Sequence, residues 1–166
     1  MSIAQSMLPE FDHEMAGTRK MLERLPEDKL EFKPDPKSMA LGRLAGHTAE
    51  MPGWGAMIVS TDELDLVPGA FEYLTATSRQ QVLAAFDKVV TDTRAALAGA
   101  TDAQMMGVWT LKVGGNAVMS MPRVAMIRSM VMNHTIHHRA QLGVYYRMNG
   151  VPIPGLYGPS ADEQNF

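Results

Sequence analysis

The sequence contains no cysteine among its 166 residues. Disulfides, cysteine-based zinc sites and a cysteine nucleophile are therefore excluded, and the redox compartment stays open. The net charge is only -3 with histidine neutral, and like charges do not gather in any long run. A basic stripe is what nucleic-acid binding would need, so we expect no nucleic-acid partner.

Long apolar runs are also missing. A membrane-spanning helix needs about 20 consecutive apolar residues, and no segment approaches that length or offers a basic amphipathic surface for lipid. The N-terminal stretch, residues 1–25, carries four carboxylates, which a secretory signal would not tolerate. These features predict no membrane partner and a cytoplasmic location.

Four segments place apolar residues every three or four positions, which is the period of a helix buried on one face. They cover residues 3–25, 38–58, 78–97 and 121–145. Pro52 and Gly53 should interrupt the second segment. The third begins with a capping-box pattern, Ser78 followed by Gln81, and should stop at Gly99.

Two connections carry little helical signal. Residues 61–76 contain Asp62, Pro68 and Gly69 and are predicted to be a loop. Within residues 101–120 the apolar side chains alternate up to Gly114-Gly115-Asn116, which indicates a small hairpin or an extended loop. We therefore expect one domain, residues 1–166, with an all-α, up-down four-helix bundle.

Histidines are the residues with the clearest chemical meaning. His134 and His138 are four positions apart, which on a helix separates them by about 40° and about 6 Å. Two imidazoles so placed can share a metal ion, as the two helix histidines of HExxH zinc sites do. The spacing alone is weak evidence, because most histidines are exposed or hydrogen-bonded.

The surrounding pattern strengthens the metal hypothesis. His134 and His138 continue the apolar stripe of their helix, and His47 lies on the apolar stripe between Leu44 and Met51. A buried imidazole without a partner costs about 1–3 kcal/mol. We therefore predict one divalent metal ion bound by His47, His134 and His138. A hydrogen-bonded histidine core without metal is the alternative.

The other two histidines are assigned differently. His137 lies on the flank of the same helix and is a candidate to support the ligands, although pairing of His134 with His137 is also geometrically allowed. His13 is two residues from both Phe11 and Met15, so it should point away from the apolar stripe into solvent. The roles of His137 and His13 are not fixed by the sequence.

Several short motifs occur together in order. Residues 133–142 contain a histidine, three residues, a second histidine and then Arg-Ala-Gln, and residues 41–47 form a leucine-containing run that ends in His47. The closing segments 151–152, 155–158 and 161–163 complete the pattern. Together they resemble the DinB/YfiT-like family of metal-dependent proteins, with Ala140 where that family commonly has glycine.

The resemblance implies a four-helix bundle, frequent homodimerisation and one divalent ion. Nickel or zinc is implied first, with iron, manganese or copper as further candidates. Relatives of known function include transferases that use low-molecular-weight thiols and a thiol-dependent maleylpyruvate isomerase. A small thiol and an electrophile are therefore the expected partners, and the alternative is a non-enzymatic metal-binding or stress-response protein.

Three neutral imidazoles would leave the charge of a divalent ion uncompensated and at least one coordination position open. An ion in that state lowers the pKa of a coordinated thiol or water. The expected chemistry is thus thiol activation for S-transfer or isomerisation. Glu50, one helical turn from His47, is the candidate catalytic residue, either orienting an imidazole or acting as a base. A plain surface carboxylate is the other interpretation of Glu50.

Overall fold

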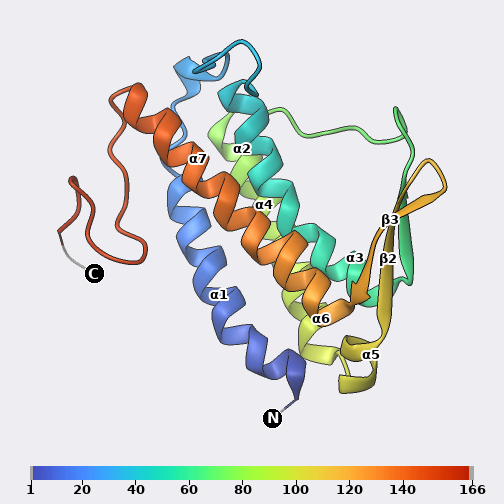
Figure 1. Cartoon of the computed structure of the whole chain (residues 1–166). Coiled ribbons are helices and arrows are strands. Elements are labelled where there is room, and N and C mark those ends of the chain that lie inside the picture. The colour runs from blue at the N-terminus through green and yellow to red at the C-terminus, as the bar shows by residue number, and fades with distance from the viewer. Residues whose placement is uncertain (1, 165–166) are drawn as a thin grey trace.

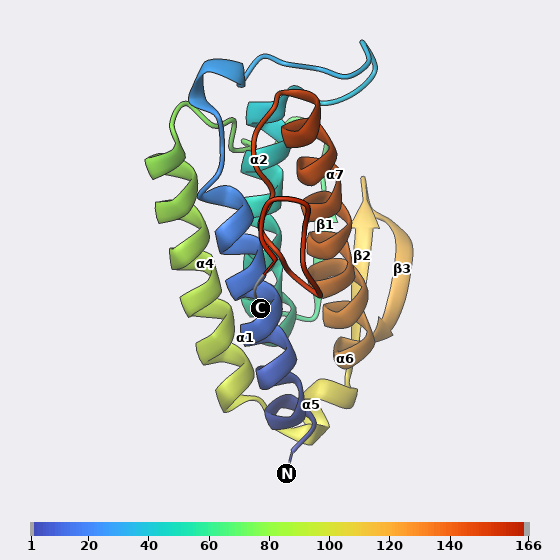
Figure 2. The same cartoon turned by 90° about the vertical axis from the view of Figure 1, so that its left-hand side faces the viewer.

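Four long helices pack side by side in the computed structural model, which describes residues 2–164 (Figure 1). They are α1 (Ile3–Leu22), α2 (Leu41–Glu50), α4 (Arg79–Gly99) and α7 (His134–Met148). Helix α4 packs against α1 and α2, and α7 packs against the same two helices from the other side (Figure 2). The four helical segments expected from apolar spacing therefore correspond to the four long helices.

Shorter helical pieces connect the long ones. A 3-10 turn, Glu27–Lys29, follows α1, and a second one, Met51–Gly53, joins α2 to α3 (Trp54–Ser60). This second turn contains Pro52, so the predicted interruption is confirmed.

The approach to the last long helix is irregular. Helix α5 (Asp102–Met106) precedes residues 108–122, which form the last two strands, and α6 (Arg123–Met126) continues as a π-helical turn, Ile127–Asn133, directly into α7. Single π-helical turns inside helices are often found at functional sites, because they change which side chains face the interior.

Local capping explains where the longest helices begin. Ser2 accepts a hydrogen bond from the backbone N–H of Gln5 at the start of α1, and Ser78 accepts one from Gln81 at the start of α4. Such caps satisfy backbone donors that have no partner in the first turn. The predicted start of α4 at Ser78 and its end at Gly99 are both confirmed.

A three-stranded mixed sheet lies beside the helices (Figure 1). Strand β2 (Val108–Val113) is central and pairs in parallel with β1 (Glu63–Leu66) and antiparallel with β3 (Asn116–Pro122). The hairpin between β2 and β3 turns at Gly114 and Gly115, whose φ angles are +56° and +81°. Two consecutive positive φ angles suit a tight hairpin and favour glycine. Of the two alternatives, the hairpin is therefore correct.

The prediction of a purely all-α, up-down four-helix bundle is wrong, because the structure contains this sheet. The segment predicted as loop, residues 61–76, contributes β1, in which Leu64 lies opposite Leu111 of β2. A strand of only four residues shows too little alternation to be separated from a loop. Its parallel partner is also distant in sequence, and parallel pairing leaves no local turn signal.

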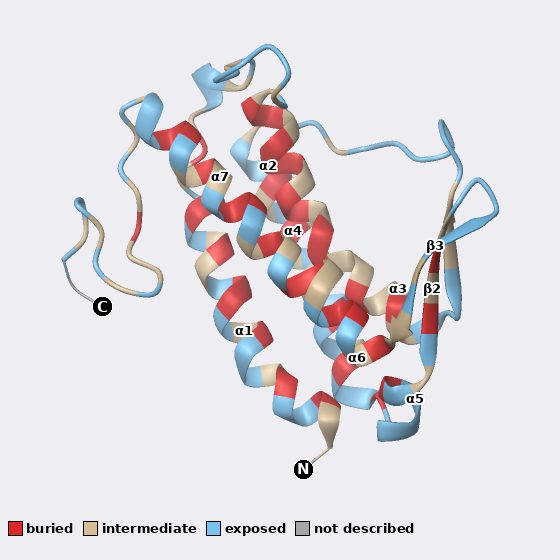
Figure 3. Ribbon diagram, viewed as in Figure 1, coloured by how far each residue is buried: buried red, intermediate tan, exposed pale blue. Residues whose placement is uncertain are grey.

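The core lies between the helices and continues under the sheet (Figure 3). Phe11, Phe86 and Leu142 are completely buried in the bundle, and Trp109 of β2 is completely buried between sheet and helices. The indole N–H of Trp109 donates to Thr61 Oγ1 at 3.0 Å, so its polar atom is satisfied. Within residues 2–164, no helix is long and apolar enough to cross a membrane.

Arg123 joins the sheet to the bundle from the start of α6. Its buried guanidinium donates to the backbone carbonyls of Ile58 (2.8 Å), Val108 (3.3 Å) and Thr61 (2.6 Å) and to the carboxylate of Asp62 (2.6 Å). These acceptors belong to the end of α3, the start of β2 and the turn that leads into β1. One side chain therefore fixes three segments that approach from different parts of the chain.

Replacing Arg123 by methionine should lower the free energy of unfolding by about 2–4 kcal/mol, because several acceptors would lose their donor. Chemical denaturation measures this change. The matched control is Arg128→Met, since Arg128 makes an exposed ion pair with Glu10, and such pairs contribute about 0–1 kcal/mol. Equal losses in both variants would contradict the role assigned to Arg123.

Candidate metal centre

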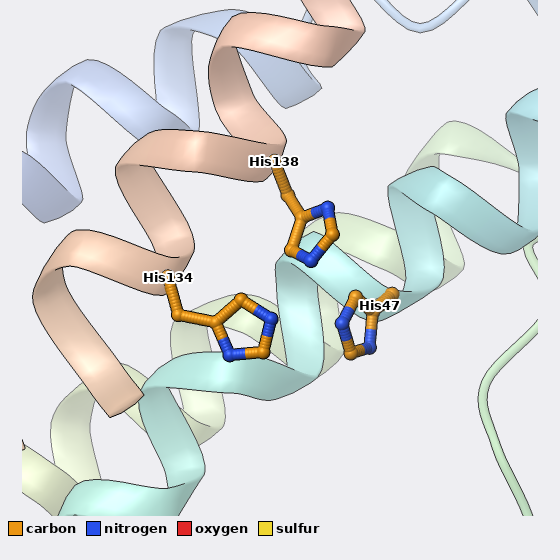
Figure 4. Close-up of side chains that lie close together, drawn as sticks. All are labelled: His47, His134 and His138. Carbon is orange, nitrogen blue, oxygen red and sulfur yellow. The ribbon is translucent and has the colours of Figure 1, made fainter. Parts of the chain in front are cut away.

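Three imidazoles from two helices meet inside the bundle (Figure 4). One ring nitrogen from each of His47, His134 and His138 can be chosen so that all three lie within 4.8 Å of one another. The ring centroid of His138 is 4.5 Å from that of His47 and 4.7 Å from that of His134. The structure thus brings together the three residues singled out in the sequence.

Helix packing and the π-helical turn place these side chains. His47 lies on the face of α2 that packs against α7. His134 is the first residue of α7, directly after the π-helical turn, and His138 follows one turn later on the same face. The two α7 imidazoles are therefore stacked along the helix and face the single imidazole of α2.

The imidazoles are held in the neutral form. Burial lowers the pKa of His47 to about 4, and the neighbouring His138, Arg43 and His134 add to this effect. Burial is also the main cause that lowers the pKa of His134 and of His138. A lowered pKa means that each ring keeps a free lone pair at pH 7, which is the form that binds a metal.

Gln141 fixes the orientation of His138. The Gln141 Oε1 atom lies 2.7 Å from Nδ1 of His138, and Gln141 Nε2 lies 3.1 Å from Nε2 of His137. A carboxamide oxygen only accepts hydrogen bonds, so Nδ1 of His138 carries the proton and its Nε2 keeps the lone pair. His137 is exposed and stands outside the cluster, but it is connected to the cluster through Gln141.

The donor set fits a divalent metal ion. Nδ1 of His47 and Nδ1 of His134 are both buried without a hydrogen-bond partner among residues 2–164. Such atoms are costly unless a ligand satisfies the ring. Three neutral imidazole nitrogens are a donor set used for zinc, nickel, copper and iron.

A cavity of about 420 Å³ opens beside the cluster, and His47 and His134 form part of its wall. We call it the apolar chamber. Its other walls are mostly apolar side chains from α3, the sheet and the π-helical turn: Trp54, Met57, Leu64, Leu66, Leu111 and Met130. The sheet that the sequence did not predict thus supplies part of the chamber.

Part of the remaining wall is formed by Phe71, Glu72 and Tyr73. They belong to residues 71–76, which we call the strap. The carboxylate of Glu50 accepts the backbone N–H of Leu74, and Arg43 Nη1 donates to the carbonyl of Leu74 at 2.9 Å. A Cβ atom on Gly46 would lie 1.9 Å from that carbonyl oxygen. Glycine at position 46 is therefore required for the strap to cross α2 beside His47.

Glu50 lies in the chamber wall, and both of its carboxylate oxygens have partners. One oxygen accepts the backbone N–H of Leu74 in the strap, and the other lies 3.4 Å from Nη1 of Arg43. Within residues 2–164, Glu50 makes no hydrogen bond to the three imidazoles. The structure thus shows a contact to the strap, while a catalytic role of Glu50 stays a prediction. His13 is exposed, as expected.

Sequence analysis did not predict two parts of the site. The contact of Gln141 with His138 and His137 could have been found from its spacing, because Gln141 lies three and four residues after them and so shares their helix face. The wall formed by Leu64, Leu66 and Leu111 could not, since it depends on the pairing of β1 with β2.

The fold and the site define a class of small helical protein with a mixed sheet and a three-histidine candidate metal centre. A model of the DinB family matches residues 1–165. The chain therefore belongs to the DinB family, as the histidine motifs implied.

Two kinds of relatives agree with this assignment. The uncharacterized protein YrdA of Bacillus subtilis (strain 168) is 28% identical over 160 residues, which is 94% of this chain and 89% of that protein. A crystal structure of a DinB-like protein from Bacillus cereus ATCC 10987 superposes with a TM-score of 0.71, at 24% identity, over 94% of this chain and 98% of the other. The DinB-like protein YjoA from Bacillus subtilis gives a TM-score of 0.65 at 18% identity, over 97% and 99%. These structures are similar in fold.

Replacing Gln141 by leucine should weaken zinc binding by about 10–100-fold, because His138 would lose the acceptor that fixes its tautomer. Competition with a chromophoric chelator measures the affinity. Gln80→Leu, at an exposed position of α4, is the matched control and should leave affinity unchanged. An unchanged affinity in Gln141→Leu would show that the hydrogen bond does not position the ligand.

Proposed function

We propose that this protein is a metal-dependent enzyme that activates a low-molecular-weight thiol for S-transfer or isomerisation. The observation that supports this proposal is the position of the three imidazoles at the wall of the apolar chamber. A closed structural metal site would not adjoin a cavity large enough for a small molecule.

In this proposal the three histidines of the cluster are the metal ligands. His47, His134 and His138 would hold one divalent ion, with nickel or zinc proposed ahead of iron, manganese or copper. When bound, such an ion would lower the pKa of a thiol that coordinates it. The histidines contribute no negative charge, so they do not compete with a thiolate for the charge of the ion.

The chamber supports the reaction by excluding water around the electrophile. In S-transfer a sulfur–carbon bond forms while the bond to the leaving group breaks, and the thiol proton leaves with that group. In isomerisation the thiol adds and is later released unchanged. Both need the electrophile to be held close to the sulfur, and apolar walls from α3 and the sheet provide such a surface.

A non-enzymatic metal-binding or stress-response protein is the second candidate, because the same cluster could hold an ion without turnover. Metal-loaded protein should be tested with glutathione, bacillithiol, mycothiol and coenzyme A against small electrophiles. Turnover supports the enzyme, and a metal-loaded protein inert toward all of them favours the second candidate. Homodimerisation and a cytoplasmic location also stay predictions.

Replacing His138 by alanine should abolish stoichiometric metal, because two imidazoles from different helices bind a divalent ion much more weakly than three. Elemental analysis of protein purified without a histidine tag measures metal content. Added zinc should raise the melting temperature of the unaltered protein by about 5–10 °C and that of the variant hardly at all. His13→Ala, at an exposed histidine of α1, should behave like the unaltered protein. Equal losses in both variants would refute the ligand assignment.

Glu50→Gln tests the proposed base. A glutamine oxygen can still accept the N–H of Leu74, so the strap should stay in place. If Glu50 accepts the thiol proton, kcat should fall by about 100-fold or more and the acidic limb of the pH profile should disappear, while metal content is unchanged. A variant with full kcat and an unaltered pH profile would leave Glu50 only its contact to the strap.

A further inference from the structure

The apolar chamber carries few charges, and their signs restrict what it can hold. Among residues 2–164, no lysine or arginine lines it, whereas two carboxylates, Glu50 and Glu72, do. Glu72 is exposed, and its carboxylate has no ion-pair or hydrogen-bond partner within the described residues. The chamber therefore offers no side-chain counterion for an acidic ligand.

Arg43, a cation that contacts the strap but does not line the chamber, is already engaged. The guanidinium of Arg43 donates to the carbonyl of Leu74, lies 3.4 Å from the carboxylate of Glu50 and sits 5.1 Å from the centroid of the Tyr73 ring. Its charge is balanced by Glu50, and its donors are used to hold the strap. Arg43 thus stabilises the wall and is not free to bind a carboxylate inside the chamber.

The shape and surface of the chamber suit an apolar, ring-containing ligand. Its volume of about 420 Å³ lies within the range of small-molecule sites. Trp54 and Phe71 offer aromatic surfaces, and Met51, Met57 and Met130 offer flexible, polarisable ones. Aromatic and methionine side chains together adapt to flat apolar molecules of different outline.

We propose that the chamber binds an uncharged, largely apolar electrophile, aromatic or aliphatic, and rejects electrophiles that carry a carboxylate. This proposal rests on the proposed function, since it assigns the electrophile to that class. An ion on the three histidines would then hold the sulfur of the thiol. Apolar contact would retain the electrophile, and the unpaired Glu72 would repel a carboxylate on it.

A matched pair of thiols tests the proposal on zinc-loaded protein. Benzyl mercaptan and 4-(mercaptomethyl)benzoate present the same sulfur and ring, but only the second carries a distant carboxylate. Each would bind the metal through its sulfur and place its ring against the chamber wall, where the electrophile is proposed to lie. Isothermal titration calorimetry should give benzyl mercaptan an affinity at least about tenfold higher than the acid. Benzyl mercaptan should also bind more tightly than 2-mercaptoethanol, and its binding should show the negative heat-capacity change that marks burial of apolar surface.

Glu72→Lys should reduce the preference for benzyl mercaptan over the acid, since it replaces the unpaired anion by a cation. Glu31→Lys makes the same charge change at an exposed position outside the chamber and should keep the preference. Met57→Trp should fill part of the chamber and lower the affinity for benzyl mercaptan by about tenfold, with metal content unchanged. Equal or tighter binding of the acid to the unaltered protein would overturn the proposal, as would benzyl mercaptan binding no better than 2-mercaptoethanol.

The proposal about the chamber and the proposal of an enzyme can be refuted separately. Selective binding of the neutral thiol without any S-transfer would support the chamber assignment and count against the enzyme. Turnover with a strong preference for dicarboxylate electrophiles would support the enzyme and overturn the assignment of an uncharged ligand.

Discussion

The packing of α2 against α7 is the contact on which the candidate site depends. It brings His47 to the two histidines of α7, and apolar neighbours such as Leu44 and Leu142 supply the burial that holds the helices together. The same burial leaves ring nitrogens of His47 and His134 without partners. Helix packing therefore offsets the free-energy cost of burying imidazole nitrogens that have no hydrogen-bond partner within the described residues.

The sheet and the strap convert this cluster into a site with a defined interior. Arg123 fixes the strands to α3, and Glu50, Arg43 and Gly46 let the strap lie directly on α2. In a bundle without these additions, the side of the cluster that faces the chamber would be open to water. The part of the fold that departs from a plain bundle is thus the part that shapes the binding surface.

The sequence predicted what is encoded locally. Apolar spacing identified the long helices, Ser78 and Pro52 marked a start and an interruption, and the spacing of His134 and His138 on a buried stripe led to the cluster. It could not predict β1, because two alternating leucines in four residues do not distinguish a strand from a loop. Nor could it interpret Gly46, since a glycine signals a close approach only when the approaching segment is known.

The arrangement of charge follows from these same contacts. The cluster consists of neutral rings, so a bound cation would keep its charge, and the carboxylate of Glu50 in the chamber wall is balanced by Arg43. The wall of the chamber also includes an exposed carboxylate, Glu72, which has no ion-pair or hydrogen-bond partner within the described residues. The chamber therefore combines a candidate cation-binding cluster, apolar side chains and an acidic group. Under the proposed function, this combination suits a thiolate at the histidines and an electrophile without negative charge against the apolar walls.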